Sequence, residues 1–177
     1  MNRILRVVPL FAGTVIAAAL VSTLAYAEAL DATQWRFTIT FPCPSQLDSQ
    51  VVKTAIGDVV MTSYVCTSGN NAYFAAINDY PAGTVTPNNS DTVYAGVVNG
   101  EAENSKGTLR NVAPFTLGTV TGREAVLDMT EPKGVIRSRQ FLLGDRLYQV
   151  MCVEADMQDA SKTCLDFLDS FTLLPAK

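Results

Sequence analysis

The chain of 177 residues contains no histidine. Without an imidazole it cannot carry out Ser-His-Asp or Cys-His catalysis, hold zinc through histidine or shuttle protons through imidazole at neutral pH. Basic residues are also scarce, since 13 lysines and arginines stand against 17 acidic residues, for a net charge of −4. This balance lacks the excess positive charge that nucleic-acid binding requires, so we expect no nucleic-acid partner.

Motifs of catalysis and cofactor binding are absent from the sequence as well. No P-loop, dinucleotide-binding glycine pattern or nucleophile-elbow serine occurs. The remaining general acid–base candidates are Glu124 and Asp128, but four residues along one strand separate them by roughly 13 Å. This separation exceeds that used by glycoside hydrolases. The sequence therefore predicts a non-enzymatic protein without a cofactor, and a carboxylate-dependent hydrolase is a remote alternative.

The first 27 residues have the pattern of a secretory signal peptide. Arg3 and Arg6 precede an apolar stretch, and the small residues of Ala25-Tyr26-Ala27 form a peptidase site. We predict cleavage after Ala27, with a retained membrane anchor as the alternative. The mature chain, 28–177, would be a single domain without a membrane span and with 11 basic against 17 acidic residues, a net charge of −6. The predicted localisation is the periplasm or the extracellular space.

Cysteine is infrequent but even in number: the chain contains Cys43, Cys66, Cys152 and Cys164. In an exported chain this count predicts two disulfides, with three possible connectivities. We expect the pairs that are local in sequence, Cys43–Cys66 and Cys152–Cys164. A metal site is the alternative, but the chain has no Cys-x-x-Cys motif and no histidine to complete one. No metal is therefore predicted.

The pattern of apolar and polar residues indicates an antiparallel sheet with two helices, an α+β fold. Strands are expected at about residues 35–41, 51–66 (with a turn at Gly57-Asp58), 72–79, 109–115, 124–129, 135–143 and 146–154. Gly144-Asp145 is a two-residue hairpin turn. It places Leu143 opposite Arg146, Phe141 opposite Tyr148, Arg139 opposite Val150 and Arg137 opposite Cys152, all on one face of the sheet.

Both helices are predicted from capping residues and apolar spacing. The first begins at Asn89 or Ser90 and ends near Lys106. Its apolar face contains Val93, Tyr94, Val97 and Val98, and Gly96 and Gly100 are expected to allow close approach to the sheet. The second begins at Asp156 or Asp159 and ends near Ser170. Its inward face is expected to contain Ala160, Cys164, Phe167, Leu168 and Phe171.

The carboxyl half carries a series of motifs in a fixed order. These are Gly122-Arg123-Glu124, then R-x-R-x-F-L-x-G-x-R-L-Y-Q-V over residues 137–150, then Phe167-Leu168-Asp169-Ser170-Phe171. With Phe41-Pro42-Cys43 and the stretch 76–81, they resemble uncharacterised bacterial exported proteins of the PsbP-like fold. The resemblance implies an α/β/α sandwich with an antiparallel sheet of about six to seven strands. It implies accessory or binding roles rather than catalysis, but no ligand residues can be carried over.

Two clusters of charged residues are candidate sites. Arg123, Arg137, Arg139 and Arg146 lie on consecutive predicted strands and could bind an anion through their guanidinium groups. The alternative is cross-strand ion pairing, with Asp128 opposite Arg137 if residues 131–134 form the turn. The acidic residues Asp128, Glu131, Glu154, Asp156 and Asp159 could form a weak calcium site, but they lack EF-hand spacing, and helix capping explains part of the cluster.

Together these features predict an exported, non-enzymatic binding or accessory protein of the cell envelope. An envelope protein is the expected partner, and recognition would use a flat apolar patch. A small-ligand or anion-binding protein that uses the basic sheet face is the alternative, and it would need a concave pocket with converging polar groups.

Overall fold

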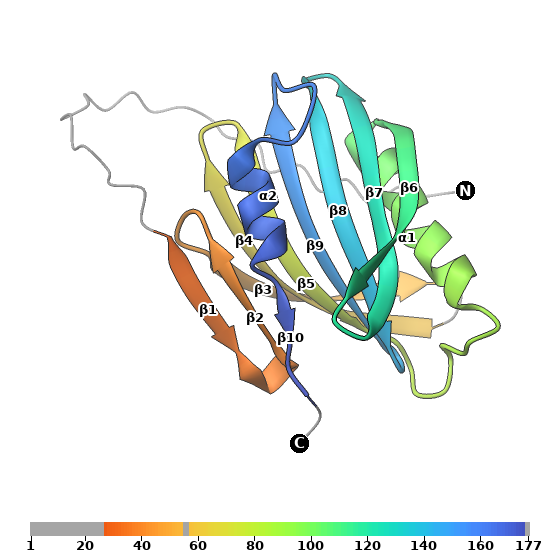
Figure 1. Ribbon diagram of the computed structural model, residues 1–177. Helices are drawn as coiled ribbons and strands as arrows, with labels where there is room; N and C mark the ends of the chain where they lie inside the picture. The colour runs from red at the N-terminus through yellow and green to blue at the C-terminus, as the bar shows by residue number, and fades with distance from the viewer. Residues whose placement is uncertain (1–26, 55–56, 176–177) are drawn as a thin grey trace.

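A computed structural model describes residues 27–54 and 57–175 of the chain, which form two antiparallel sheets and two helices (Figure 1). The large sheet has seven strands in the order β3-β4-β5-β9-β8-β7-β6. Its strands are β3 (Gln46–Thr54), β4 (Gly57–Ser68), β5 (Asn71–Asp79), β6 (Thr108–Leu117), β7 (Val120–Thr130), β8 (Lys133–Leu143) and β9 (Arg146–Ala155). The predicted antiparallel α+β fold is confirmed.

The small sheet and the helices cover the large sheet from its two faces (Figure 1). The small sheet contains β1 (Glu28–Ala32), β2 (Phe37–Phe41) and β10 (Thr172–Leu173), in the order β1-β2-β10, and a 3-10 turn, η1 (Thr33–Trp35), connects β1 to β2. It lies with α2 (Lys162–Asp169) on one face, while α1 (Ser90–Ser105) packs over β6 and β7 on the other. The result is a three-layer arrangement.

Each face of the large sheet has its own core. Aromatic rings dominate the core on the α2 side, where Phe37, Phe41, Tyr148, Phe167 and Phe171 are all buried. The core on the α1 side is smaller and aliphatic, with Val98, Ala125, Leu127, Met129 and Ile136. The large aromatic core holds the small sheet and α2 in place, because burial of apolar area is the main favourable term in folding.

The sequence pattern misplaced the first hairpin. The turn predicted at Gly57-Asp58 within residues 51–66 is displaced, because β3 ends at Thr54 and β4 begins at Gly57, and β3 starts before residue 51, at Gln46. The register of the pair is continuous from Gln46 opposite Val65 to Thr54 opposite Gly57. The start of β3, Gln46-Leu47-Asp48-Ser49, is mostly polar because β3 lies at the sheet edge, so hydropathy alone does not reveal it.

Helix α1 forms where it was predicted, but its details differ. Asn89 precedes the helix, yet its side chain bonds to the backbone of Thr84 and Thr86, 2.8 and 2.7 Å away, instead of capping the helix. A Cβ atom at Gly96 or Gly100 would meet nothing within 4 Å in the described part of the chain, so the predicted close approach of these glycines to the sheet is wrong. Both residues lie away from the sheet, whereas Val93, Tyr94 and Val98 are buried and Val97 is half-buried.

Helix α2 begins later than predicted. Ser161 is its N-cap and accepts a hydrogen bond from the Cys164 amide, so neither Asp156 nor Asp159 caps it. Asp156 has a left-handed backbone (φ 60°), and its amide donates to the Lys133 carbonyl, which places it in the turn before the helix. The predicted inward face is confirmed, since Cys164, Phe167, Leu168 and Phe171 are buried and Ala160 is half-buried.

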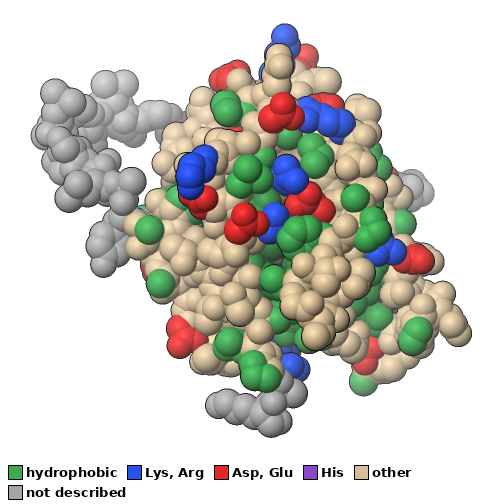
Figure 2. All heavy atoms as spheres, viewed as in Figure 1, with side chains coloured by type: hydrophobic (Ala, Val, Ile, Leu, Met, Phe, Trp, Pro, Cys, Tyr) green, Lys and Arg blue, Asp and Glu red, His purple; other side chains and the backbone are tan. Residues whose placement is uncertain are grey.

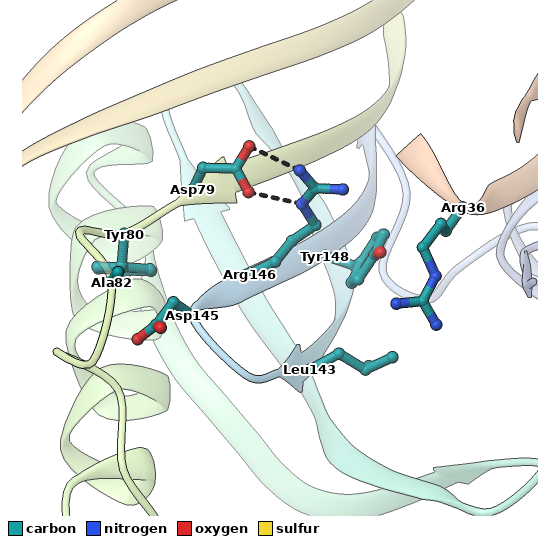
Figure 3. Close-up of a pocket in the computed structure, with 8 residues that line it drawn as sticks. All are labelled: Arg36, Asp79, Tyr80, Ala82, Leu143, Asp145, Arg146 and Tyr148. Carbon is teal, nitrogen blue, oxygen red and sulfur yellow. Dashed lines mark hydrogen bonds and ion pairs between the residues drawn. The ribbon is translucent and has the colours of Figure 1, made fainter. Parts of the chain in front are cut away.

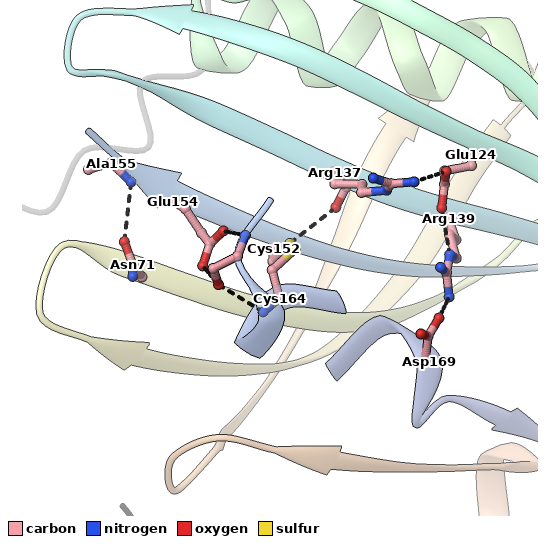
Figure 4. Close-up of a disulfide and its surroundings, with 10 residues drawn as sticks. Asn71, Glu124, Arg137, Arg139, Cys152, Glu154, Ala155, Cys164 and Asp169 are labelled. Atoms are coloured by element: carbon pink, nitrogen blue, oxygen red, sulfur yellow. Dashed lines mark hydrogen bonds and ion pairs between the residues drawn. A yellow bond between two sulfur atoms is a disulfide. The ribbon is translucent and has the colours of Figure 1, made fainter. Parts of the chain in front are cut away.

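The predicted β8–β9 register and both disulfides are confirmed. Leu143 pairs with Arg146, and the register continues to Arg137 opposite Cys152. Cys43–Cys66 and Cys152–Cys164 are both bonded, each with 5.7 Å between Cα atoms. The second bond attaches α2 to β9 (Figure 4).

The predicted signal peptide lies outside the described residues, apart from Ala27. The first strand, β1, begins at Glu28, the residue that follows the predicted cleavage site. Within the part of the chain that the structure describes, no helix has the length and apolar character needed to cross a bilayer.

Candidate functional site

Two of the candidate arginines, Arg137 and Arg139, share one carboxylate. Glu124 accepts from Arg137 at 2.5 Å and from Arg139 at 2.8 Å, and Arg139 also reaches Asp169 at the end of α2, 2.7 Å away (Figure 4). The Arg139 guanidinium lies 4.0 Å from the centre of the Phe115 ring. Partial burial acts to raise the pKa of Glu124, but the bonds from the two arginines outweigh it, so that pKa lies below its ordinary value. Glu124 therefore stays ionised and suits structural pairing better than proton transfer.

The predicted partner of Arg137 was wrong. Asp128 pairs across the sheet with Val135, and Arg137 lies opposite Val126, because the turn between β7 and β8 is shorter than the predicted 131–134. This two-residue change moves the acid that reaches Arg137 from Asp128 to Glu124.

The other two candidate arginines also have carboxylate partners. Arg123 lies on the α1 side and pairs with Asp91 at 2.7 Å. Arg146 forms a bidentate pair with Asp79, at 2.5 and 2.8 Å, and its guanidinium lies 5.5 Å from the centre of the Trp35 ring. The four arginines thus lie on two faces of the sheet and do not converge. Figure 2 shows basic and acidic side chains side by side on the α2 face.

Two residues of the acidic cluster pair with Arg110, an arginine outside the predicted site. Arg110 pairs with Asp128 and with Asp159, the latter at 2.7 Å, and donates to the Gln158 carbonyl at 2.6 Å. Glu154 accepts from the amide and hydroxyl of Ser161 at the start of α2. Over residues 27–54 and 57–175, no group of three acids or cysteines is placed to hold a metal ion.

A pocket of about 340 Å³ opens beside the β8–β9 hairpin. Its lining comes from four segments: the residue before β2, the end of β5 with the loop after it, and both arms of the hairpin. Figure 3 shows Tyr148 between the side chains of Arg36 and Arg146, with Leu143 below. The lining residues are Arg36, Asp79, Tyr80, Ala82, Leu143, Asp145, Arg146 and Tyr148. Of the predicted site residues, this pocket contains Arg146 alone.

A second pocket, of about 490 Å³, lies at the other end of the sheet. Arg110, Asp128 and Asp159 line it, and their mutual ion pairs cross it. Met129 and Met157 supply its apolar surface. Because these charges already pair with one another, the pocket offers a ligand little electrostatic attraction.

A buried polar cluster connects α1 to the large sheet. Glu101 is 8% exposed and accepts from the Ser138 hydroxyl at 2.7 Å and from the amides of Gln140 and Gln149 at 3.0 and 2.7 Å. Burial raises the pKa of Glu101, and these three hydrogen bonds offset the increase only in part. Ser138 and Gln140 are completely buried, so the cluster forms part of the packing between α1 and the large sheet.

Strand β3 exposes an apolar surface at one edge of the large sheet. Leu47 and Val51 are each 61% exposed, and Val60, opposite Val51, is 43% exposed. The three side chains lie on one face, because the register places Leu47 opposite Tyr64 and Val51 opposite Val60. We call Leu47, Val51 and Val60 the β3 apolar patch. It could have been found in the sequence only if β3 had been recognised as an edge strand.

Comparisons with known proteins reveal similarity at the level of the fold. No sequence family and no curated protein matches the chain. Among solved structures, the chain is similar to cyanobacterial PsbP (CyanoP) from Synechocystis sp. PCC 6803, known from a solution structure. The two superpose with a TM-score of 0.54 at 13% sequence identity, over 89% of this chain and 98% of the cyanobacterial one. The chain therefore has a PsbP-like fold, as its motifs predicted.

Proposed function

We propose that this protein is a non-enzymatic accessory protein that binds a partner protein through β3. The observation that carries this proposal is the β3 apolar patch on a strand with one neighbour, β4, among the described residues. An unpaired strand edge offers a row of backbone donors and acceptors that an incoming strand can use. The patch supplies the apolar contacts that strand addition alone does not.

The contrast between the two edges of the large sheet supports this choice. The opposite edge, β6, contains Pro114 and a register shift between Leu109 and Asn111, two devices that hinder strand addition. Strand β3 has neither device, and its nine residues pair with β4 without a break. Natural proteins usually protect long regular edges, so an edge without proline or a register shift suggests a binding role.

The proposed partner is an extended protein segment with apolar side chains at alternate positions. Such a segment would pair with the backbone of β3 and place its apolar side chains beside Leu47 and Val51. The opposite face of β3 carries Asp48, Gln50 and the exposed Val52, so it suits both polar and apolar residues of the partner. The two disulfides and the predicted signal peptide favour a partner in the cell envelope.

The alternatives have weaker support. A hydrolase would need Glu124 or Asp128 to exchange protons, but both pair with arginines. An anion site on the basic sheet face stays a prediction, and it would have to displace the carboxylates that already occupy Arg137 and Arg139.

Site-specific photo-crosslinking in the native envelope tests the proposal. A crosslinker at Leu47 or at Val51 should capture a distinct partner protein. With the crosslinker at Leu47, Val51→Lys should reduce capture by at least tenfold. Val112, 40% exposed on β6, is the matched control, and Val112→Lys should leave capture unchanged. Equal loss with both variants, retained capture with Val51→Lys, or capture of a second copy of this chain would overturn the proposal.

A further inference from the structure

We propose that the pocket beside the β8–β9 hairpin binds a small organic monocarboxylate, with Arg36 as the counter-ion. This site is separate from β3, so it goes beyond the accessory function and its test is independent of that function.

Among the described residues, the charged side chains around the pocket include one cation that has no anionic partner. Arg146 has both oxygens of Asp79, at 2.5 and 2.8 Å. The Asp145 carboxylate accepts from the amides of Gly83 and Val85, at 2.7 and 2.8 Å, and these bonds hold its pKa below the ordinary value. Within the part of the chain that the structure describes, Arg36 is the one arginine with no carboxylate within 4.0 Å.

Arg36 is also held in a conformation that arginine rarely adopts. Its backbone is left-handed, with φ 63° and ψ 39°, in the region that favours glycine. Its amide donates to the Thr33 carbonyl at 3.0 Å, and its carbonyl accepts from the Leu174 amide at 2.9 Å. Residues kept in such conformations tend to gather at functional sites, where the surrounding structure compensates for the strain.

The side chain of Arg36 retains hydrogen-bonding capacity. One terminal nitrogen, Nη2, donates to the Leu174 carbonyl at 3.3 Å, which fixes the guanidinium at the pocket. Its Nε is buried and has no hydrogen-bond partner among the described residues. A guanidinium has five N–H donors, so one weak bond to a carbonyl leaves most of them for a carboxylate.

The remaining walls indicate the class of ligand. Leu143, Tyr80 and Tyr148 surround the space with apolar and aromatic surface, and about 340 Å³ accommodates one small molecule. Asp79 and Asp145 also line the pocket, so the second negative charge of a phosphate or a dicarboxylate would meet more repulsion than a single carboxylate does. The pocket therefore suits a ligand that has a single carboxylate, to pair with Arg36, and an apolar or aromatic remainder, to contact the two tyrosines.

Titration of the purified protein with benzoate tests this inference. We expect saturable shifts of the amide resonances of Leu143 and Asp145, with benzyl alcohol and inorganic phosphate binding at least tenfold more weakly. Arg36→Gly should weaken benzoate binding at least tenfold, yet leave the thermal midpoint equal or higher, because glycine adopts a φ of 63° without strain. A residue retained only for stability would give the opposite result.

Two further variants keep the test decisive. Arg123→Gln removes an arginine on the α1 side of the sheet and should leave benzoate affinity unchanged. Arg36→Lys keeps the charge and loses the guanidinium, and should weaken binding less than Arg36→Gly does. No saturable shift, equal binding by Arg36→Gly, equal loss in Arg123→Gln, or tighter binding of phosphate than of benzoate would each overturn the inference.

Discussion

At the scale of single residues, Glu101 makes the stability of the protein depend on pH. Its pKa in the folded state is raised by burial, so the folded state binds the proton more tightly than the unfolded state does. The stabilising effect of the protonated acid is complete below the unfolded pKa. It is lost as the pH rises through the folded pKa.

We therefore expect Glu101→Gln to be more stable than the parent protein at pH 7, by on the order of 1 kcal/mol. The difference should vanish near pH 4, where both side chains are neutral. Urea unfolding at the two pH values measures the effect. Glu103→Gln, at an exposed position on the same helix, is the control and should show no such difference. A loss of stability in Glu101→Gln at pH 7 would mean that the ionised carboxylate supports the fold.

Gly122 is required by close packing between β7 and β8. A Cβ atom there would lie 1.9 Å from the Gln140 carbonyl oxygen and 2.7 Å from the Phe141 ring. Backbone and a buried ring have little room to move, so Gly122→Ala should cost about 3 kcal/mol or more. Gly100→Ala, whose Cβ would meet nothing within 4 Å, should instead stabilise α1 by about 0.5–1 kcal/mol. Denaturant midpoints of the two variants should move in opposite directions.

At the scale of elements, α2 depends on its links to the large sheet. The helix has eight residues, which is too short to be stable alone in water. The Cys152–Cys164 bond attaches its first turn to β9, and Asp169 at its last turn pairs with Arg139 on β8. The helix is thus anchored at both ends.

Replacing both Cys152 and Cys164 with alanine should lower the free energy of unfolding by about 3 kcal/mol, because the bond closes a loop that restricts the unfolded chain. Amide exchange should then increase in α2 more than in α1. Uniform exchange across both helices would indicate that the bond stabilises the whole domain and has no particular role in anchoring α2. Asp169→Asn, which removes the exposed partner of Arg139, should have a much smaller effect.

At the scale of the whole molecule, local sequence patterns predicted the interior strands and both helices. Alternation of apolar and polar residues is strong where one sheet face is buried, as in the β8–β9 hairpin, and there even the register was correct. The patterns missed β10, whose pairing with β2 joins residues far apart in sequence, and they also missed β1, although it pairs with β2 as its neighbour along the chain. The polar start of β3 was missed for the different reason that edge strands are under little pressure to be apolar.

The residues of the candidate site divide in the same way, into those that local sequence patterns predicted and those that depend on distant contacts. The sequence identified Arg146 but not Arg36, because Arg36 is distinguished only by its left-handed backbone and its contact with Leu174, 138 residues away. The four predicted arginines do not form one cluster in the structure. Neighbours along a strand alternate between faces, and the register between β7 and β8 places Arg123 on the face opposite to Arg139. Which arginines have carboxylate partners depends on tertiary structure.

The bonds between Arg36 and Leu174 have a consequence for biosynthesis. Leu174 supplies the hydrogen bonds that fix both the backbone and the guanidinium of Arg36. A nascent chain therefore cannot assemble this pocket until residue 174 has been translated. If the protein crosses a membrane unfolded, the carboxylate can be captured only on the far side.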